Sequence, residues 1–218
     1  MLFADRRQAG QILAPRLIRY ADDSDVIVLA LPRGGVPVAY EVAAVLHAPL
    51  DVFVVRKLGL PGHEEFAMGA IATGGVTVMN PELADFHIPE AAIETVVARE
   101  RSELARRETL YRGERPPLSV EARIAILVDD GLATGSTMLA AATAVRRQRP
   151  KRIVVAVPVA AAETCRSFHS EVDDVVCAHT PEPFDAVGLW YRDFSQTTDA
   201  EVHALLAAAW DAQARRDT

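Results

Sequence analysis

A short apolar run that ends in two carboxylates constrains the fold of this chain more than any other stretch. Residues 124–128 read Ile-Ala-Ile-Leu-Val, which is typical of a strand that is buried on both faces of a parallel sheet. Asp129 and Asp130 follow directly, and the apolar spacing of residues 138–145 predicts a helix from about Ser136. Because a strand, a short loop and a helix follow one another here, we expect an α/β fold.

The loop between this predicted strand and helix, from Gly131 to Thr137, consists mainly of small residues. Small residues let the backbone turn tightly and direct its N–H groups into one concave nest. The unpaired amides and the dipole at the start of the helix also favour an anion. Two acids at one end and an anion site at the other suit a ligand that carries hydroxyls, or a bound cation, and a phosphate. A ribose 5-phosphate is such a ligand.

The sequence Asp-Asp-Gly-Leu-Ala-Thr-Gly-Ser-Thr at residues 129–137 closely resembles the phosphoribosyl-pyrophosphate (PRPP) motif of type I phosphoribosyltransferases. The resemblance implies that Asp129 and Asp130 contact the ribose hydroxyls of PRPP and take part in catalysis. It also implies that the 5-phosphate is held by the loop that comprises Ala133, Thr134, Gly135, Ser136 and Thr137. No Lys follows Gly135, so the stretch is not a Walker A loop. A structural glycine-rich turn is the alternative.

A second predicted strand also runs into glycines, and here a cation is added. The buried run 26–31 is followed by Pro32, Arg33, Gly34 and Gly35, and then by a helix. Taken alone, the glycine pair is equally typical of a plain strand-to-helix turn. The resemblance implies that this is the pyrophosphate loop, in which Arg33 and the amides of the two glycines bind PRPP and Arg33 takes a catalytic part. Relatives often contain a non-proline cis peptide here, so we expect the Pro32–Arg33 bond to be cis or able to become cis.

A third strand is predicted at residues 51–55, and it would end at Arg56 and Lys57. Open α/β sheets bind ligands at the carboxyl ends of their strands. Cationic side chains at that position are therefore candidates for ligand binding, although a solvated surface charge is the common alternative. Relatives often carry a basic residue at this point. The resemblance therefore implies that Lys57 contacts PRPP and adds positive charge during catalysis.

The remaining predicted elements alternate between strands and helices. They are a helix from Asp5, a mobile segment at 59–66, a hairpin of 67–72 and 76–79 about Thr73-Gly74-Gly75, a helix at 89–112, a strand at 152–157 ended by Pro158, a helix at 160–168, a strand at 172–177, and a helix after the capping box at Thr198. This alternation supports a doubly wound, mainly parallel central sheet flanked by helices. The resemblance implies one domain over 1–218, with a flexible flap at about 58–80 that closes over PRPP, and a C-terminal hood at about 181–197.

The segment from Pro181 to Phe194 is irregular and rich in aromatic residues, and it resembles the hood that receives the base in some relatives. Phe184, Trp190 and Tyr191 are candidates to stack on a planar acceptor. The alternative is that these rings pack the hood onto the core, which is the usual place of aromatic side chains.

Charge and hydropathy argue against several classes of protein. A net charge of −7 and a pI near 5.4 argue against a nucleic-acid partner, which needs a basic face. A membrane span needs about 20 consecutive apolar residues, and no segment of the sequence approaches that length. The N-terminal residues also lack the apolar region of a signal peptide. Cys165 and Cys177 have no metal-like spacing, so we expect reduced, buried cysteines in a cytoplasmic protein.

The resemblance implies transfer of a 5-phosphoribosyl group from PRPP to a nucleobase or amine, with release of pyrophosphate. It also implies Mg²⁺, held mainly by the diphosphate and reached by Asp129 and Asp130 only through water. The acceptor stays open, because residues 158–163 lack the lysine of purine-salvage relatives and the Asp-Arg pair of orotate-type relatives is missing. The alternatives are a regulator that senses PRPP or a nucleotide without turnover, and a hydrolase that uses water. A homodimer follows from the resemblance alone.

Overall fold

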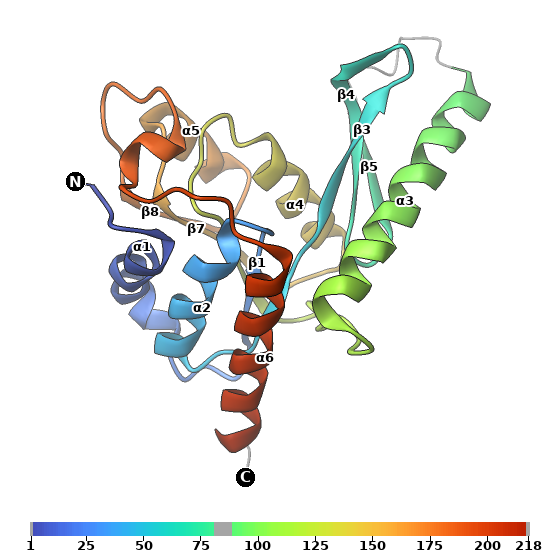
Figure 1. Ribbon diagram of the computed structural model, residues 1–218. Helices are drawn as coiled ribbons and strands as arrows, with labels where there is room; N and C mark the ends of the chain where they lie inside the picture. Colours follow the sequence, from blue (N-terminus) through green and yellow to red (C-terminus); the bar gives the residue numbers. More distant parts are fainter. Residues whose placement is uncertain (1, 81–88, 217–218) are drawn as a thin grey trace.

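Residues 2–80 and 89–216 are described by the computed structural model of the chain (Figure 1). Its centre is a five-stranded sheet with the strand order β2-β1-β6-β7-β8, in which all neighbours are parallel. The strands are β1 (Val26–Ala30), β2 (Leu50–Val52), β6 (Ile124–Val128), β7 (Arg152–Val159) and β8 (Asp174–His179). The expected α/β fold with a mainly parallel central sheet is confirmed. The two ends of the predicted domain, residues 1 and 217–218, lie outside the described residues.

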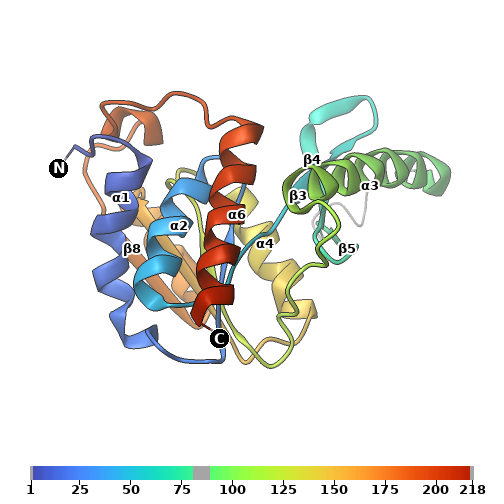
Figure 2. The ribbon, with the colours of Figure 1, turned by 60° about the horizontal axis from the view of Figure 1, so that its bottom comes forward.

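Helices cover both faces of this sheet, which gives the molecule three layers (Figure 2). One face carries α1 (Arg6–Leu13), the 3-10 helix η1 (Ala14–Tyr20), α2 (Gly35–Leu46) and α6 (Asp199–Arg216). The other face carries α4 (Ser136–Arg147), α5 (Ala162–Ser167) and the 3-10 helix η3 (Phe168–Ser170). Among the helices of the described residues, none combines the length and the apolar character that crossing a membrane requires.

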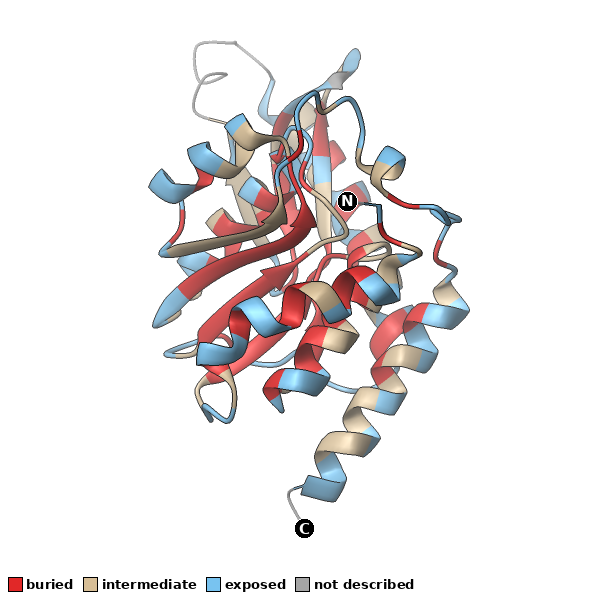
Figure 3. Cartoon of the chain, turned by 90° about the vertical axis from the view of Figure 1, so that its left-hand side faces the viewer, coloured by how far each residue is buried: buried red, intermediate tan, exposed pale blue. Residues whose placement is uncertain are grey.

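The neighbouring strands β1 and β6 are buried at every position, and Figure 3 shows the buried sheet between its helices. Side chains alternate between the two faces of a strand. Val26 and Val28 therefore join the core beneath α2 and α6, whereas Ile27 and Leu29 join the core beneath α4. Burial on both faces explains why these strands read as continuous apolar runs rather than as alternating patterns.

A second sheet of three antiparallel strands stands beside the first, and the long helix α3 (Glu90–Arg112) packs against it (Figure 1). Its strands are β3 (Val55–Leu60), β4 (His63–Ala72) and β5 (Val76–Met79). The predicted hairpin about Thr73-Gly74-Gly75 is confirmed, because Ala72 pairs with Val76 across that turn.

The segment 59–66, which was expected to be mobile, forms a second tight hairpin in which Leu60 pairs with His63. Pro61 and Gly62 form its turn, and Gly62 has a φ of +79°. A proline followed by a glycine with positive φ is the signature of a type II turn. The two residues that suggested a loop therefore reverse the chain between two strands.

The strand expected at 51–55 is divided between the two sheets. β2 ends at Val52 and β3 begins at Val55, so Arg56 and Lys57 lie within the hairpin sheet. The prediction that these cations end a strand of the parallel sheet is therefore wrong. The break is hidden in the sequence because the two residues between the strands, Phe53 and Val54, are also buried.

Pro158 does not end β7, contrary to expectation, since this strand continues to Val159. β6 ends opposite Ala156, so the proline lies beyond the part of β7 that is paired on both sides. A proline is tolerated in a strand where the ladder does not need its missing N–H.

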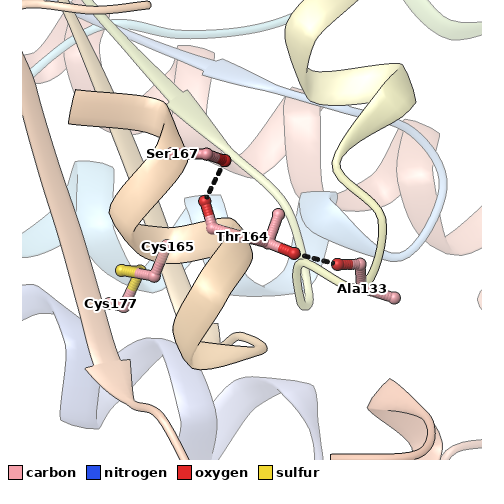
Figure 4. Close-up of a disulfide and its surroundings, with 5 residues drawn as sticks. All are labelled: Ala133, Thr164, Cys165, Ser167 and Cys177. Carbon is pink, nitrogen blue, oxygen red and sulfur yellow. Dashed lines mark hydrogen bonds between the residues drawn. A yellow bond between two sulfur atoms is a disulfide. The ribbon is translucent and has the colours of Figure 1, made fainter. Parts of the chain in front are cut away.

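Cys165 of α5 and Cys177 of β8 form a disulfide (Figure 4). The prediction of reduced, buried cysteines is therefore wrong, and both residues are half-buried. Their Cα atoms lie 6.6 Å apart, within the range that a disulfide bridges. The pairing depends on α5 folding back beside β8, which a separation of 12 residues does not reveal.

Candidate active site

The loops that follow β1 and β6 emerge side by side, because these two strands are neighbours in the sheet. Ala30 pairs with Val128 at the last position of both strands, and the Leu31 amide donates to the Val128 carbonyl oxygen at 2.8 Å. Since the strands are parallel, both loops leave the same edge of the sheet, where open α/β sheets bind ligands. The two loops singled out in the sequence, at 31–35 and 129–137, therefore meet at this edge.

The two loops approach so closely that a side chain between them would collide. A Cβ atom on Gly34 would lie 2.0 Å from Asp130 Oδ2, and one on Gly35 would lie 2.9 Å from Asp129 Cα. The backbone φ of Gly34 is −58°, which other residues adopt freely. Lack of space, rather than backbone conformation, therefore requires glycine at this position.

The amides of the two glycines differ in their availability. The Gly35 amide donates to the Leu31 carbonyl oxygen at 3.0 Å, so the turn already engages it. The Gly34 amide has no hydrogen-bond acceptor among residues 2–80 and 89–216. Of the two amides expected to bind pyrophosphate, the Gly34 amide is therefore the one that is available to a ligand.

The Pro32–Arg33 peptide is cis, as expected. The Arg33 guanidinium points to the start of α6, where its Nη1 lies 3.7 Å from Asp199 Oδ1, and its side chain is 32% exposed. Tyr111 donates to the same carboxylate oxygen at 3.0 Å, and burial raises the pKa of its hydroxyl to about 12. A long, partly exposed ion pair contributes little to stability, so Arg33 can exchange Asp199 for an anionic ligand at small cost.

Asp129 and Asp130 stand at the end of β6 in a largely enclosed position. Burial raises the pKa of Asp129 well above its usual range, and the charge of Asp130 raises it further. Burial also raises the pKa of Asp130, although the guanidinium of Arg6 opposes this effect. Two adjacent carboxylates that are costly to ionise favour a ligand that brings hydrogen-bond donors or a cation.

Arg6, the first residue of α1, is a site residue that the sequence did not reveal. Its Nε donates to Asp130 Oδ2 at 2.8 Å, and its Nη1 donates to the Ser195 carbonyl oxygen at 2.6 Å. The predicted helix start at Asp5 is confirmed, because the Asp5 carboxylate accepts from the Gln8 amide. No local pattern, however, connects Arg6 with an acid 124 residues away.

The loop expected to hold the 5-phosphate is supported from behind by α5 and η3. Thr164 donates its hydroxyl to the Ala133 carbonyl oxygen at 2.6 Å, as Figure 4 shows. Gly135 has a φ of +77°, and a Cβ atom there would lie 2.6 Å from the Phe168 ring. The predicted helix start at Ser136 is confirmed. The first amides of a helix have no partner within it, so those of α4 remain for an anion.

Four of the five residues expected at this phosphate are exposed, namely Ala133, Thr134, Ser136 and Thr137, whereas Gly135 is buried. The hydroxyls of Thr134 and Ser136 lie 3.3 Å apart. The loop therefore presents two hydroxyls and the start of a helix on one exposed surface.

Lys57 lies in β3, on the opposite face of the strand from Arg56, and it is exposed. Arg56 points to α3, where its Nη2 lies 2.6 Å from Glu100 Oε2. Arg56 therefore joins β3 to α3, whereas the exposed Lys57 lies on the other face of the strand.

The three aromatic candidates belong to one cluster at the C-terminal segment. Phe184 and Trp190 stack with ring centroids 6.5 Å apart, and both are half-buried. Tyr191 is 6% exposed and packs on Phe3, and its hydroxyl donates to the Asp130 carbonyl oxygen at 2.5 Å. The packing alternative therefore describes Tyr191 best, while Phe184 and Trp190 are only partly buried.

Comparisons with known proteins agree with this geometry. Residues 6–187 match the family model described as the phosphoribosyl transferase domain. Two Mycobacterium tuberculosis proteins, from strains CDC 1551 and H37Rv, are each provisionally named a phosphoribosyl transferase and are 46% identical to this chain over 209 residues. The match covers 95% of this chain and 47% of each of those proteins, so the chain spans about half the length of these curated relatives.

The crystal structure of the protein TT1426 from Thermus thermophilus is also similar, with a TM-score of 0.84 and 44% identity. That comparison covers 95% of this chain and 99% of the other. The family model accounts for most of the chain, including both loops of the candidate site. The chain therefore belongs to the phosphoribosyl transferase domain family.

Proposed function

We propose that this protein transfers the 5-phosphoribosyl group of PRPP to a nitrogen atom of a nucleobase or amine and releases pyrophosphate. The observation that carries this proposal is the contact between the two loops, in which Gly34 lies against the Asp130 carboxylate. A single ligand with phosphates at both ends of a ribose can therefore reach both loops. The acid pair suits the sugar hydroxyls, and the helix starts beside it suit the phosphates.

Each part of the site would then have its own task. Asp129 and Asp130 would accept hydrogen bonds from the ribose hydroxyls. The amides and hydroxyls from Ala133 to Thr137 would hold the 5-phosphate. Arg33 and the Gly34 amide would bind the pyrophosphate, with Gly35 providing the close approach of the loops. Lys57 would add positive charge from the hairpin sheet.

During the transfer, the bond between C1 of the ribose and the pyrophosphate oxygen breaks, and its electron pair leaves with the pyrophosphate. The acceptor nitrogen donates its lone pair to C1 and loses a proton. Negative charge develops on the leaving group, so a cation and an amide placed there stabilise the transition state more than the ground state. Residues 58–80, which form most of the sheet of β3, β4 and β5, would be the flap whose closure keeps competing water away from C1.

Mg²⁺ would be held mainly by the diphosphate of PRPP, in keeping with its habit of using few protein ligands. Within the described part of the chain, no group of three or more His, Cys, Asp or Glu side chains is placed to hold a metal ion. The oxygen-rich pair of Asp129 and Asp130 nevertheless fits a hard cation reached through bound water. When bound, the ion neutralises charge on the diphosphate.

The acceptor would lie beneath the C-terminal segment, which we propose as the hood. Phe184 and Trp190 are half-buried there, and aromatic rings suit a planar acceptor. Residues 158–163, which follow the body of β7, contain no cation to meet an exocyclic oxygen. We therefore leave the acceptor as a nucleobase or amine that does not depend on a lysine at this point.

Two assays test the proposal. Isothermal titration calorimetry with Mg²⁺–PRPP measures binding at the shared site, and pyrophosphate release across a panel of nucleobases and small amines measures transfer. We expect binding, and release that depends on one acceptor class. Release without any acceptor would indicate hydrolysis, and binding without release across the panel would indicate a sensor. Either result would contradict transfer.

The double variant Asp129→Asn with Asp130→Asn isolates the acid pair. We expect it to lose tight PRPP binding while its circular dichroism spectrum stays native. The matched control is Asp22→Asn with Asp23→Asn, which changes two adjacent exposed acids before β1, at the opposite edge of the sheet. Retained affinity in the first variant would show that the acids have another role.

A further inference from the structure

We propose that Arg6 is a positioning residue for the acid pair: its guanidinium holds the Asp130 carboxylate where the ribose would meet it and fastens that carboxylate to the hood. This inference rests on the proposed function and adds to it a residue that lies outside both loops. It predicts that PRPP affinity depends on a side chain that need not touch the ligand.

The Arg6 guanidinium is held on three sides. Besides its bonds to Asp130 and to the Ser195 carbonyl oxygen, its Cζ lies 4.0 Å from the centroid of the Phe194 ring. The Arg6 side chain is only 12% exposed, so solvent screens its charge less than that of a surface arginine. A planar fork stacked on a ring and fixed by two hydrogen bonds loses little further freedom when a ligand binds.

The start of the chain is tied to the hood on both sides of this contact. The Phe3 amide donates to the Trp190 carbonyl oxygen at 2.9 Å, and the Arg192 amide donates to the Phe3 carbonyl oxygen at 2.8 Å. The Asp193 amide continues the pattern by donating to the Ala4 carbonyl oxygen at 2.9 Å. Because Arg6 follows these residues directly, the position of the hood fixes the position of the guanidinium.

Arg6 engages only one oxygen of the acid. Its Nε binds Asp130 Oδ2, which leaves Oδ1 of the same carboxylate outside this ion pair. A Cβ atom on Gly34 would lie 3.2 Å from Arg6 Nε, so the guanidinium also lies against the pyrophosphate loop. Arg6 thus holds one oxygen of Asp130, leaves the other to a sugar hydroxyl, and places positive charge beside an anionic ligand.

Arg7, the next residue of α1, supplies a matched control. Its side chain is 71% exposed and its Nε lies 2.8 Å from Glu41 Oε1 on α2, away from the acid pair. Arg7→Gln therefore removes the same charge and the same kind of bond from the same helix. We expect it to leave PRPP affinity within about twofold of that of the unchanged protein, as is usual for exposed pairs.

The test measures Mg²⁺–PRPP binding by calorimetry, together with KM and kcat, for Arg6→Gln, Arg6→Lys and Arg7→Gln. Loss of a charge-assisted hydrogen bond predicts that Arg6→Gln binds PRPP about tenfold or more weakly. Its KM for PRPP should rise by more than its kcat falls. Arg6→Lys should recover part of the affinity, because lysine keeps the charge but lacks the planar fork.

Phe194→Leu keeps the Arg6 guanidinium and removes the ring beneath it. If Arg6→Gln does not fold, this variant tests whether PRPP affinity depends on the position of the guanidinium. We expect severalfold weaker PRPP binding by Phe194→Leu. Unchanged affinity in Arg6→Gln, or in Phe194→Leu where Arg6→Gln does not fold, would overturn the inference, and so would an equal loss in Arg7→Gln. Tighter binding by Arg6→Gln would also overturn it, since Arg6 would then compete with the ribose. Failure of the unchanged protein to bind PRPP would overturn the proposed function and this inference together.

Discussion

Adding one methyl group at Gly34 tests the close approach of the two loops. The φ and ψ of Gly34 are −58° and −34°, which alanine adopts without strain. If backbone conformation alone mattered, Gly34→Ala would stabilise the protein by about 0.4–1 kcal/mol, because alanine restricts the unfolded chain. The structure predicts a change of the opposite sign.

The new Cβ atom would lie 2.0 Å from Asp130 Oδ2 and 2.7 Å from Asp130 Cγ, so the carboxylate must move by roughly 1 Å or more to reach ordinary contact. That movement breaks the 2.8 Å bond from Arg6. A hydrogen bond to a charged group is worth about 1.5–3 kcal/mol. When the stabilisation by alanine is subtracted from the loss of this hydrogen bond, the free energy of unfolding should fall by roughly 1–2 kcal/mol. For a chain of this size, Tm would fall by roughly 2–8 °C.

Gly35→Ala is the companion variant, because its Cβ atom would meet backbone, 2.6 Å from the Val128 carbonyl oxygen. Backbone cannot rotate away as a carboxylate can, so we expect a larger loss of stability than for Gly34→Ala. Thermal unfolding measures both losses, and calorimetry should show that Gly34→Ala binds PRPP at least about tenfold more weakly. A more stable Gly34→Ala protein with unchanged affinity would refute the described contact.

Two further predictions concern the disulfide and the acid pair. The double variant Cys165→Ser with Cys177→Ser opens a loop with a sequence separation of 12 residues. The greater chain entropy of the unfolded state should then lower the free energy of unfolding by about 3 kcal/mol, which denaturant unfolding measures. Two free thiols in the untreated protein would contradict the pairing. Burial raises the pKa of Asp129 in the folded state, so its ionisation costs stability as pH rises through that pKa. Asp129→Asn should therefore raise Tm near pH 8, and the gain should vanish below about pH 4, where this carboxyl is protonated in both states. A gain that does not vary with pH would show that ionisation is not the cause.

The sequence predicted the parts of the site that local pattern determines. The apolar run 124–128, the acids after it and the helix start at Ser136 lie together in the chain, so their order predicts strand, loop and helix. The cis Pro32–Arg33 peptide bond, in contrast, was expected only from the resemblance to a known family. That the two loops would meet depended on β1 and β6 being neighbours, and the resemblance to a known family, rather than any spacing, supplied that expectation.

Contacts between distant segments could not be predicted in this way. Arg6 binds Asp130 across 124 residues, and nothing near either residue announces the pair. Lys57 was expected at the end of a strand of the parallel sheet, because the buried residues before it hide the passage from one sheet to the other. The disulfide from Cys165 was missed for a related reason, since only the packing of α5 beside β8 brings its sulfurs together.

If the two loops bind the two ends of one ligand, fragments of PRPP should compete with PRPP itself, and calorimetry measures this competition. Ribose 5-phosphate and pyrophosphate would each be titrated into the protein with Mg²⁺, alone and in the presence of PRPP. We expect PRPP to bind more tightly than either fragment and each fragment to compete with it, since each would occupy one of the two loops. If pyrophosphate or ribose 5-phosphate bound without weakening the binding of PRPP, the two loops would belong to separate sites and would not share one ligand.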